Sequence, residues 1–129
     1  MRKVVTSAPS FPEAQLDALL TLECGVRWQV ACGDAGHWRV GFYSPAETSA
    51  AAIQELETHN CPEFFLLLTG RLVLVLRDEM GTREVELKPG KPILVQAAHS
   101  GYCPGGAHSG VAIVVERDAF ETTYELYAG

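Results

Sequence analysis

The chain lacks the features that define several large classes of protein. It has ten lysines and arginines against sixteen aspartates and glutamates, a formal net charge of −6 over 129 residues. This acidic balance argues against nucleic acid or an anionic membrane as a partner, because both are negatively charged. No stretch reaches the roughly 18 to 20 apolar residues of a membrane span, and the first residues contain no apolar secretory core. We therefore expect a cytoplasmic protein whose partner is a small molecule.

Several motifs of zinc, redox and nucleotide chemistry are also missing. The four cysteines form no C-x-x-C pair, which excludes a zinc knuckle and a thioredoxin-type redox motif. We expect Cys24, Cys32, Cys61 and Cys103 to be free and mostly buried, although the sequence leaves a disulfide between two of them open. The chain contains no Ser-His-Asp order, no phosphate-binding glycine loop and no dinucleotide fingerprint, so those enzyme classes are set aside.

What is present indicates one globular domain, residues 1–129, with 47% hydrophobic residues and a mean hydropathy of +0.07. The segment 1–25 predicts a short strand over Lys3–Thr6, followed by one amphipathic helix that begins near Pro12 and ends at Gly25. Leucines at positions 16, 19, 20 and 22 form the apolar face of that helix. From residue 26 to 129, short apolar runs alternate with turn residues, which is typical of a β-sandwich or barrel.

The predicted strands of the barrel are rich in Val, Leu, Phe and Tyr. They are Val26–Ala31, Trp38–Tyr43, Phe64–Leu68, Leu72–Arg77, Glu84–Leu87, Ile93–Val95, Val111–Glu116 and Thr123–Tyr127. Segment Ala46–Glu57 is compatible with either a helix or a strand. The turn Asp78–Gly81 predicts a hairpin.

Because Leu72–Leu76 is apolar on both faces, its second face should meet another sheet or another subunit, and we expect a homodimer.

The segment from Glu57 to Gly70 carries the most informative spacing. His59 is followed after three residues by Glu63 and after six more by Gly70. At the mouth of a strand this spacing can point two metal ligands into a barrel while the glycine reverses the chain. Here the sequence resembles the cupin superfamily, whose first motif is G-x5-H-x-H-x3,4-E-x6-G. The match is complete from His59 onward, whereas Glu57 and Ala51 replace the first histidine and the leading glycine.

The second cupin motif, G-x5-P-x-G-x2-H-x3-N, should follow one hairpin later, and it is only partly preserved. Counted from Gly90, the histidine of the motif falls on Gly101, but a histidine stands two residues earlier at His99. A shift of two residues keeps the side chain on the same face of an extended strand. His99 can therefore face the interior, and His108 is the competing candidate for this position.

The resemblance implies an all-β fold: a cupin-like antiparallel β-barrel, also called a double-stranded β-helix or jelly roll, with one short N-terminal helix, often as a dimer. Carried over residue by residue, it implies a divalent metal ion (Fe, Mn, Ni or Zn) bound by His59, Glu63 and His99. Glu57 is a further candidate ligand, since a glutamate can ligate such an ion through oxygen. Two imidazoles and one carboxylate leave coordination positions open for substrate or oxygen.

Two functions follow as alternatives. In the first, a metal-binding cupin acts on or recognises a small polar metabolite, an organic acid or a sugar derivative, as a dioxygenase, isomerase or lyase. In the second, a metal-free cupin serves as a ligand-binding or dimerisation module, and the pair formed by His59 and Glu63 only closes the barrel. The sequence assigns no catalytic residue in either case.

Four further residues are candidates for contact with the substrate: Arg39, Tyr43, Tyr102 and His108. Arg39 could orient an anionic metabolite, because an anion needs a fixed cation. The alternative for Arg39 is a solvent-facing position on its strand, and for His108 a position on the surface beyond a glycine-rich loop.

Overall fold

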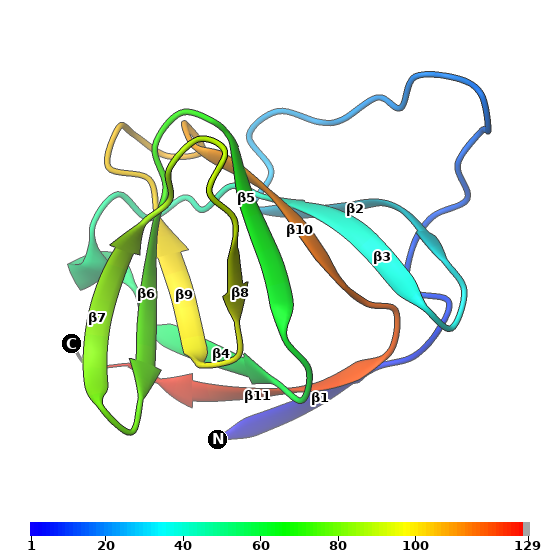
Figure 1. The fold of residues 1–129 in the computed structure, drawn as a ribbon. Coiled ribbons are helices and arrows are strands. Elements are labelled where there is room, and N and C mark those ends of the chain that lie inside the picture. The colour runs from blue at the N-terminus through cyan, green and yellow to red at the C-terminus, as the bar shows by residue number, and fades with distance from the viewer. Residues whose placement is uncertain (128–129) are drawn as a thin grey trace.

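A computed structural model, which describes residues 1–127, consists almost entirely of antiparallel β-strands (Figure 1). The strands are β1 (Arg2–Thr6), β2 (Trp28–Asp34), β3 (Trp38–Tyr43), β4 (Glu55–His59), β5 (Glu63–Thr69), β6 (Val73–Asp78), β7 (Gly81–Glu86), β8 (Ile93–Val95), β9 (Ala98–Tyr102), β10 (Val111–Arg117) and β11 (Phe120–Leu126). A 3-10 turn, η1 (Ala50–Ala52), precedes β4. Within the described residues, no helix is long and apolar enough to cross a membrane.

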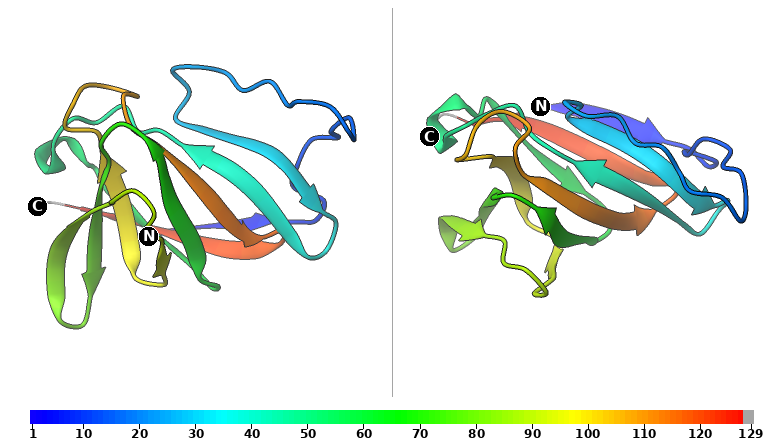
Figure 2. Two further views of the ribbon diagram at one scale, coloured as in Figure 1. Left: turned by 45° about the horizontal axis from the view of Figure 1, so that its top comes forward. Right: turned by 90° about the horizontal axis from the view of Figure 1, so that it is seen from above.

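The strands form two sheets that enclose the core (Figure 2). One sheet has the order β1-β11-β4-β9-β6-β7, and the other has the order β2-β3-β10-β5-β8. In β10 every second residue is buried, namely Ala112, Val114 and Glu116, because alternate side chains of a strand point to opposite faces. The main core cluster combines residues of both sheets: Phe65, Leu72, Leu74, Leu76, Leu87, Val95, Cys103, Ala112 and Val114. The expected all-β barrel is therefore confirmed.

Strand β6 is apolar on both faces, and the chain itself covers both of them. Leu74 and Leu76 lie in the core between the sheets. On the opposite face, Val75 is fully buried and packs with Ile53 and Leu56. These two residues come from the segment 46–57, which resolves into η1 and β4. The second face of β6 thus needs no second subunit to bury it.

Two turns follow the sequence pattern. Strands β6 and β7 form the expected hairpin, with Asp78 paired to Gly81. At Gly70, which ends the first motif, the backbone has φ +71°, and a Cβ atom there would lie 2.1 Å from the carbonyl oxygen of Ser109. Only glycine fits both conditions, since other residues adopt this conformation rarely.

All four cysteines are free; Cys61 and Cys103 are buried, while Cys24 is exposed.

The predicted N-terminal helix is wrong. Residues 7–27 contain only turns, bends and irregular chain, which loop away from the barrel (Figure 1). Leu16 and Leu19 are 84% and 101% exposed, so the apolar face of the expected helix has nothing to pack against. A short helix is marginal in water without tertiary packing, which explains why leucine spacing alone does not produce one. The predicted strand before it is confirmed as β1.

Candidate metal centre

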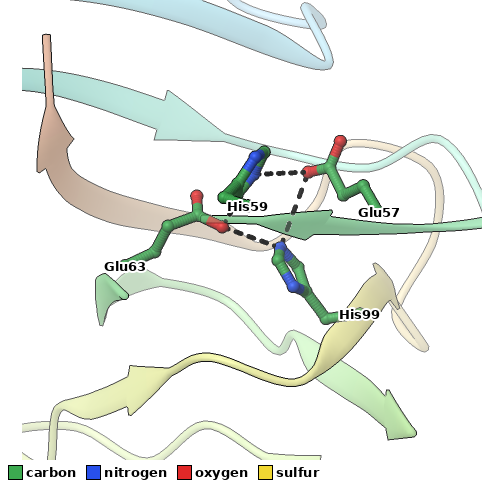
Figure 3. Close-up of side chains that lie close together, drawn as sticks. All are labelled: Glu57, His59, Glu63 and His99. Atoms are coloured by element: carbon green, nitrogen blue, oxygen red, sulfur yellow. Dashed lines mark ion pairs between the residues drawn. The ribbon is translucent and has the colours of Figure 1, made fainter. Parts of the chain in front are cut away.

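Three strands from both sheets bring Glu57, His59, Glu63 and His99 together inside the barrel (Figure 3). Glu57 and His59 are two residues apart on β4 and therefore share a face. His99 on β9 lies directly opposite Glu57 in the register of the two strands. Glu63 comes from β5, in the other sheet. The four expected metal ligands thus converge on one point.

The distances define a tight group in which Glu63 is central. Its Oε1 atom lies 2.9 Å from Nε2 of His59 and 2.9 Å from Nε2 of His99. The Oε1 atom of Glu57 is farther from the same two nitrogens, at 3.6 and 3.5 Å. One ligand atom from each of the four residues can be chosen so that all lie within 4.8 Å of one another. Glu57 is the most exposed member, with 36% of its side chain accessible, so it marks the open side of the group.

The far sides of both imidazole rings are fixed by other groups. Nδ1 of His99 donates to the carbonyl oxygen of Ala97 at 2.9 Å, which leaves Nε2 as the lone-pair nitrogen of the neutral ring. Nδ1 of His59 lies 2.7 Å from Oγ1 of Thr122. Such outer contacts are typical of metal-ligating histidines, because they set the tautomer and the orientation of the ring.

Within residues 1–127, two buried atoms of the group have no hydrogen-bond partner when the His99 ring is neutral: Oε1 of Glu63 and Nε2 of His99. A carboxylate oxygen and an imidazole lone pair that face each other repel unless a cation or a proton lies between them. Buried polar atoms are rarely left unpaired, so this arrangement has a specific cause. Two imidazole nitrogens and carboxylate oxygens form a donor set that suits a divalent transition metal, and the residues present therefore fit such an ion.

The pKa values of the four groups show that the centre attracts positive charge. Burial by itself lowers the pKa of the two histidines, but Glu57 and Glu63 outweigh it and raise the values to about 9 for His59 and about 10 for His99. Burial likewise raises the pKa of both carboxyls, but the histidines outweigh it. The pKa of Glu57 falls to about 2, and that of Glu63 falls well below its usual range. Without a metal ion, the histidines therefore hold protons at neutral pH.

The group lines a cavity of about 490 Å³, which opens between the sheets and also contains Arg39 and Tyr43 as expected. Arg39 is 8% exposed and is not solvent-facing. Its Nη2 atom lies 2.8 Å from Oε2 of Glu116, and its Nη1 atom donates to the carbonyl oxygen of Ser10. The guanidinium is thus held by a buried carboxyl group, and burial together with the nearby Glu63 raises the pKa of Glu116 to about 8. Burial is the main cause that raises the pKa of Tyr43, so its hydroxyl stays protonated.

The other two expected substrate residues lie outside the lining of this cavity. Tyr102 is three positions from His99 on the same strand, so alternation places it on the outer face, where its hydroxyl binds Glu84. His108 lies in the loop after β9, and its Nδ1 atom donates to the carbonyl oxygen of Ser44. Of the two histidines considered for the second motif, His99 is the one that reaches the centre.

Sequence reasoning missed several residues that shape the site. Thr122 orients His59, Glu116 binds Arg39, and the rings of Trp28 and Phe120 line the cavity. None of them lies in a recognisable motif. Thr122, Glu116 and Phe120 reach the site because β10 pairs with β3 and β11 pairs with β4, each more than fifty residues away in the sequence, and no local spacing signals such pairing.

Comparison with known proteins identifies the fold. No family model matches the chain, and no curated protein sequence matches it. Among solved structures, a Co(II) form of HppE in complex with substrate has a TM-score of 0.55 at 16% identity, over 69% of this chain and 51% of that chain. Hydroxypropylphosphonic acid epoxidase from S. wedmorenis has a TM-score of 0.54 at 14% identity, over 91% of this chain and 62% of that chain.

A third structure is similar along nearly its whole length. It is an RmlC-like cupin with a double-stranded β-helix fold from Methanocaldococcus jannaschii, with a TM-score of 0.50 at 12% identity, over 81% of this chain and 93% of that chain. In contrast, this chain spans less than two thirds of the length of the two enzyme structures. Together with the two sheets described above, these similarities show that the chain has the double-stranded β-helix fold of the cupin superfamily.

Proposed function

We propose that this protein is a metal-binding cupin that holds one divalent cation through His59, His99 and Glu63, with Glu57 as a fourth ligand. The observation that carries the proposal is the close approach of buried Oε1 of Glu63 to Nε2 of His99, at 2.9 Å, which requires a cation or a proton between the two atoms. A cation at this point satisfies both atoms. The two carboxylates also balance the charge of a divalent ion.

The donor set favours Fe, Mn, Ni or Zn as the ion. Two histidines and one carboxylate form the minimal set of non-haem iron(II) enzymes, and imidazole also suits zinc and nickel. One structurally similar protein, HppE, has been solved with Co(II) and substrate. The more distant and more exposed Glu57 adds a second carboxylate, which suits a hard or borderline divalent ion.

A metal ion bound here would act as a Lewis acid that polarises an oxygen atom of the substrate. The chain supplies a cavity of suitable size for a small metabolite, about 490 Å³, with apolar walls that include Trp28 and Phe120. Tyr43 also lines this cavity and offers a protonated hydroxyl to a ligand. We infer a dioxygenase, isomerase or lyase, because each of these reactions uses an oxygen-bound substrate at an open metal site.

The substrate we propose is a small polar metabolite, with a sugar derivative better supported than an organic acid. Arg39 is bonded to Glu116, and Arg27 is bonded to Glu47, so the side chains of both arginines of the cavity are already held by a carboxyl group. A carboxylate ligand would have to compete with these ion pairs, whereas the hydroxyl groups of a sugar would not. The apolar walls next to the polar centre also suit a ring with one polar edge.

The alternative is a metal-free ligand-binding module, and one observation favours it. The pKa values of His59 and His99, raised to about 9 and about 10, allow two protons to take the place of a cation between the carboxylates. In this state the centre is a buried network of ion pairs that closes the barrel. Both functions use the same residues, and metal content separates them.

The decisive experiment is elemental analysis of protein purified without added metal or chelator. We expect one ion per chain in the wild type and in a His37→Ala control, since His37 is exposed on the turn between β2 and β3. The variants His99→Ala and Glu63→Ala should lose the ion while keeping the circular dichroism of the fold. A wild-type protein that contains no metal and does not bind added Co(II) would overturn the proposal in favour of the metal-free module.

A further inference from the structure

The inner face of the five-stranded sheet carries a row of buried ionisable side chains that starts at the metal centre. Strand β10 lies between β3 and β5 (Figure 1). Glu116 on β10 is paired with Arg39 on β3. On the other side, Val115 is paired with Phe64, so the next residues of these antiparallel strands, Glu116 and Glu63, come opposite each other. The side chains of Arg39, Glu116 and Glu63 are buried and line the cavity, so they form a continuous row across the strands.

Arg39 forms the fixed end of this row. Its Nε and Nη2 atoms donate to Oε2 of Glu116 at 2.9 and 2.8 Å. Its Nη1 atom donates to the carbonyl oxygen of Ser10 at 3.0 Å. Ser10 is itself anchored, because its backbone N–H donates to Oδ1 of the fully buried Asp118 at 2.7 Å. Every nitrogen of the guanidinium therefore has a partner within the protein, and the group is better suited to hold Glu116 than to bind a ligand.

Glu116 connects this fixed end to the metal centre. Like charges that lie directly opposite each other on neighbouring strands repel, so two buried carboxylates at these positions would destabilise the sheet. The carboxyl groups of Glu116 and Glu63 are instead hydrogen-bonded to each other, which places one proton between them. Glu63 is thus held from within its own sheet by Glu116, while its Oε1 atom faces the two histidines of the other sheet.

The two histidines of the centre have outer contacts of their own. Nδ1 of His59 lies 2.7 Å from Oγ1 of Thr122, and Nδ1 of His99 donates to the carbonyl oxygen of Ala97. A glutamate depends on such a contact more than a histidine does, since its longer side chain has more torsions to fix and loses more conformational entropy. Partners of a ligating carboxylate set its orientation and support metal affinity. The row supplies this partner for Glu63.

We propose that Glu116 and Arg39 are positioning residues for Glu63. Arg39 holds the carboxyl group of Glu116, and Glu116 holds Glu63 so that its Oε1 atom stays directed at His59 and His99. The inference rests on the proposed function, because it concerns the affinity of the metal centre. It gives Arg39 a role in metal binding in place of the contact with substrate that the sequence suggested. Both residues act on the ion only through Glu63.

Titration of variants with Co(II) tests this role, with calorimetry for affinity and visible absorption for the ligand geometry of the ion. Glu116→Gln keeps a donor for Glu63 and an acceptor for Arg39, so we expect the affinity and the spectrum of the wild type. The double variant Arg39→Leu with Glu116→Leu removes the row without leaving a buried charge. We expect its Co(II) affinity to fall about 10-fold and its spectrum to change, while its urea midpoint stays close to that of the wild type.

Two further variants separate positioning from charge and from stability. Arg39→Lys keeps the positive charge but cannot reproduce the contacts of the guanidinium fork, so its Co(II) affinity should lie between those of the wild type and the double variant. Ser44→Ala is the control for stability, because the buried Oγ atom of Ser44 donates to the carbonyl oxygen of Gly110 at 2.7 Å, away from the cavity. We expect this control to lower the urea midpoint and to leave Co(II) binding unchanged.

The outcomes distinguish this inference from the proposed function. A double variant or an Arg39→Lys variant that binds Co(II) with the affinity and spectrum of the wild type would overturn the inference and leave the metal centre intact. A Glu116→Gln variant that loses as much affinity as the double variant would overturn it too, because the charge of Glu116 would then matter in place of its hydrogen bonds. A wild type that does not bind Co(II) would instead overturn the proposed function, and the inference with it.

Discussion

Glu63 and His99 face each other from opposite sheets, with Oε1 and Nε2 buried and 2.9 Å apart. The carbonyl oxygen of Ala97 accepts the Nδ1 proton of His99, so the neutral ring turns its lone pair toward the carboxylate. Two acceptors at this distance need a positive charge between them. Glu63 comes from β5 and His99 from β9, which belong to different sheets. The two side chains therefore meet only when the barrel is closed.

The two carboxylates of the centre should contribute unequally to metal affinity. Glu63 lies 2.9 Å from both histidines and is buried, whereas Glu57 is at 3.5 to 3.6 Å and 36% exposed. We expect Glu63→Gln to weaken Co(II) binding more than Glu57→Gln, by on the order of 10-fold or about 1.4 kcal/mol. Isothermal titration of both variants measures the difference. A larger loss in Glu57→Gln would show that Glu57 is the principal ligand.

The stability of the metal-free protein should depend on pH in a specific direction. Folding raises the pKa of His59 and His99 from 6.5 to about 9 and about 10, so their contribution is complete below pH 6.5 and is lost as pH rises through 9 and 10. Folding lowers the pKa of Glu57 from 4.5 to about 2, so its contribution is complete above pH 4.5 and is lost toward pH 2. We expect the highest urea midpoint of chelator-treated protein between pH 4.5 and 6.5.

The same titration with bound metal provides the control. Metal binding requires neutral histidines, so the ion should protect the protein more strongly as the pH rises. The difference in urea midpoint between metal-loaded and chelator-treated protein should therefore be larger at pH 9 than at pH 6. A metal-free protein whose midpoint is the same at these two values would show that the histidines do not hold protons between the carboxylates.

Thr122 should act on the metal through His59. Its Oγ1 atom lies 2.7 Å from Nδ1 of His59, and the side chain is buried. The substitution Thr122→Val keeps the shape but removes the hydrogen bond, and we expect metal affinity to fall about 10-fold. Thr123→Val is the matched control, because alternation turns that side chain away from the cavity. Equal affinity of the two variants would mean that Thr122 does not orient the ring.

We expect the buried side chains of Arg39 and Glu116 to stabilise the fold only when both are present. The side chains are 10% and 2% exposed, and Nη2 of Arg39 lies 2.8 Å from Oε2 of Glu116. Because arginine stays charged, Glu116→Leu leaves a buried cation, at a cost of about 3–5 kcal/mol in the free energy of unfolding. The double variant Arg39→Leu with Glu116→Leu should recover most of this loss in urea denaturation. A double variant less stable than Glu116→Leu would show that Arg39 stabilises the fold by itself.

Gly41 allows Trp28 to line the cavity. A Cβ atom at this position would lie 2.1 Å from the Trp28 ring, so Gly41→Ala must displace the ring. We expect a loss of about 1–3 kcal/mol in the free energy of unfolding. Gly105→Ala is the control, since its nearest neighbour would be at 3.3 Å and its φ is not positive. Tryptophan fluorescence should change in the first variant alone; an unchanged spectrum would mean that the ring keeps its place.

The grouping of the candidate metal ligands was largely predictable because their positions follow local rules. His59 and Glu63 flank the turn between β4 and β5, and the glycine at the end of β5 is required by its own backbone conformation. His99 could be placed on the interior face from side-chain parity, but the choice between it and His108 needed the structure. Tyr102 was misplaced although the same parity excludes it, because it lies three residues from His99 on β9 and therefore faces away from the centre.

The amino-acid sequence by itself determined most of the strands, the main turns and the residues that gather in the centre, because alternation and glycine conformation act within a few residues of the chain. It left β4 open between helix and strand and did not predict β9. Tertiary structure decided the rest. It covered the second face of β6 with Ile53 and Leu56, paired Arg39 with Glu116, and left residues 12–25 without a helix. Each of these outcomes depends on a partner far away in sequence, since burial, ion pairing and helix stability are properties of the surface that a segment meets.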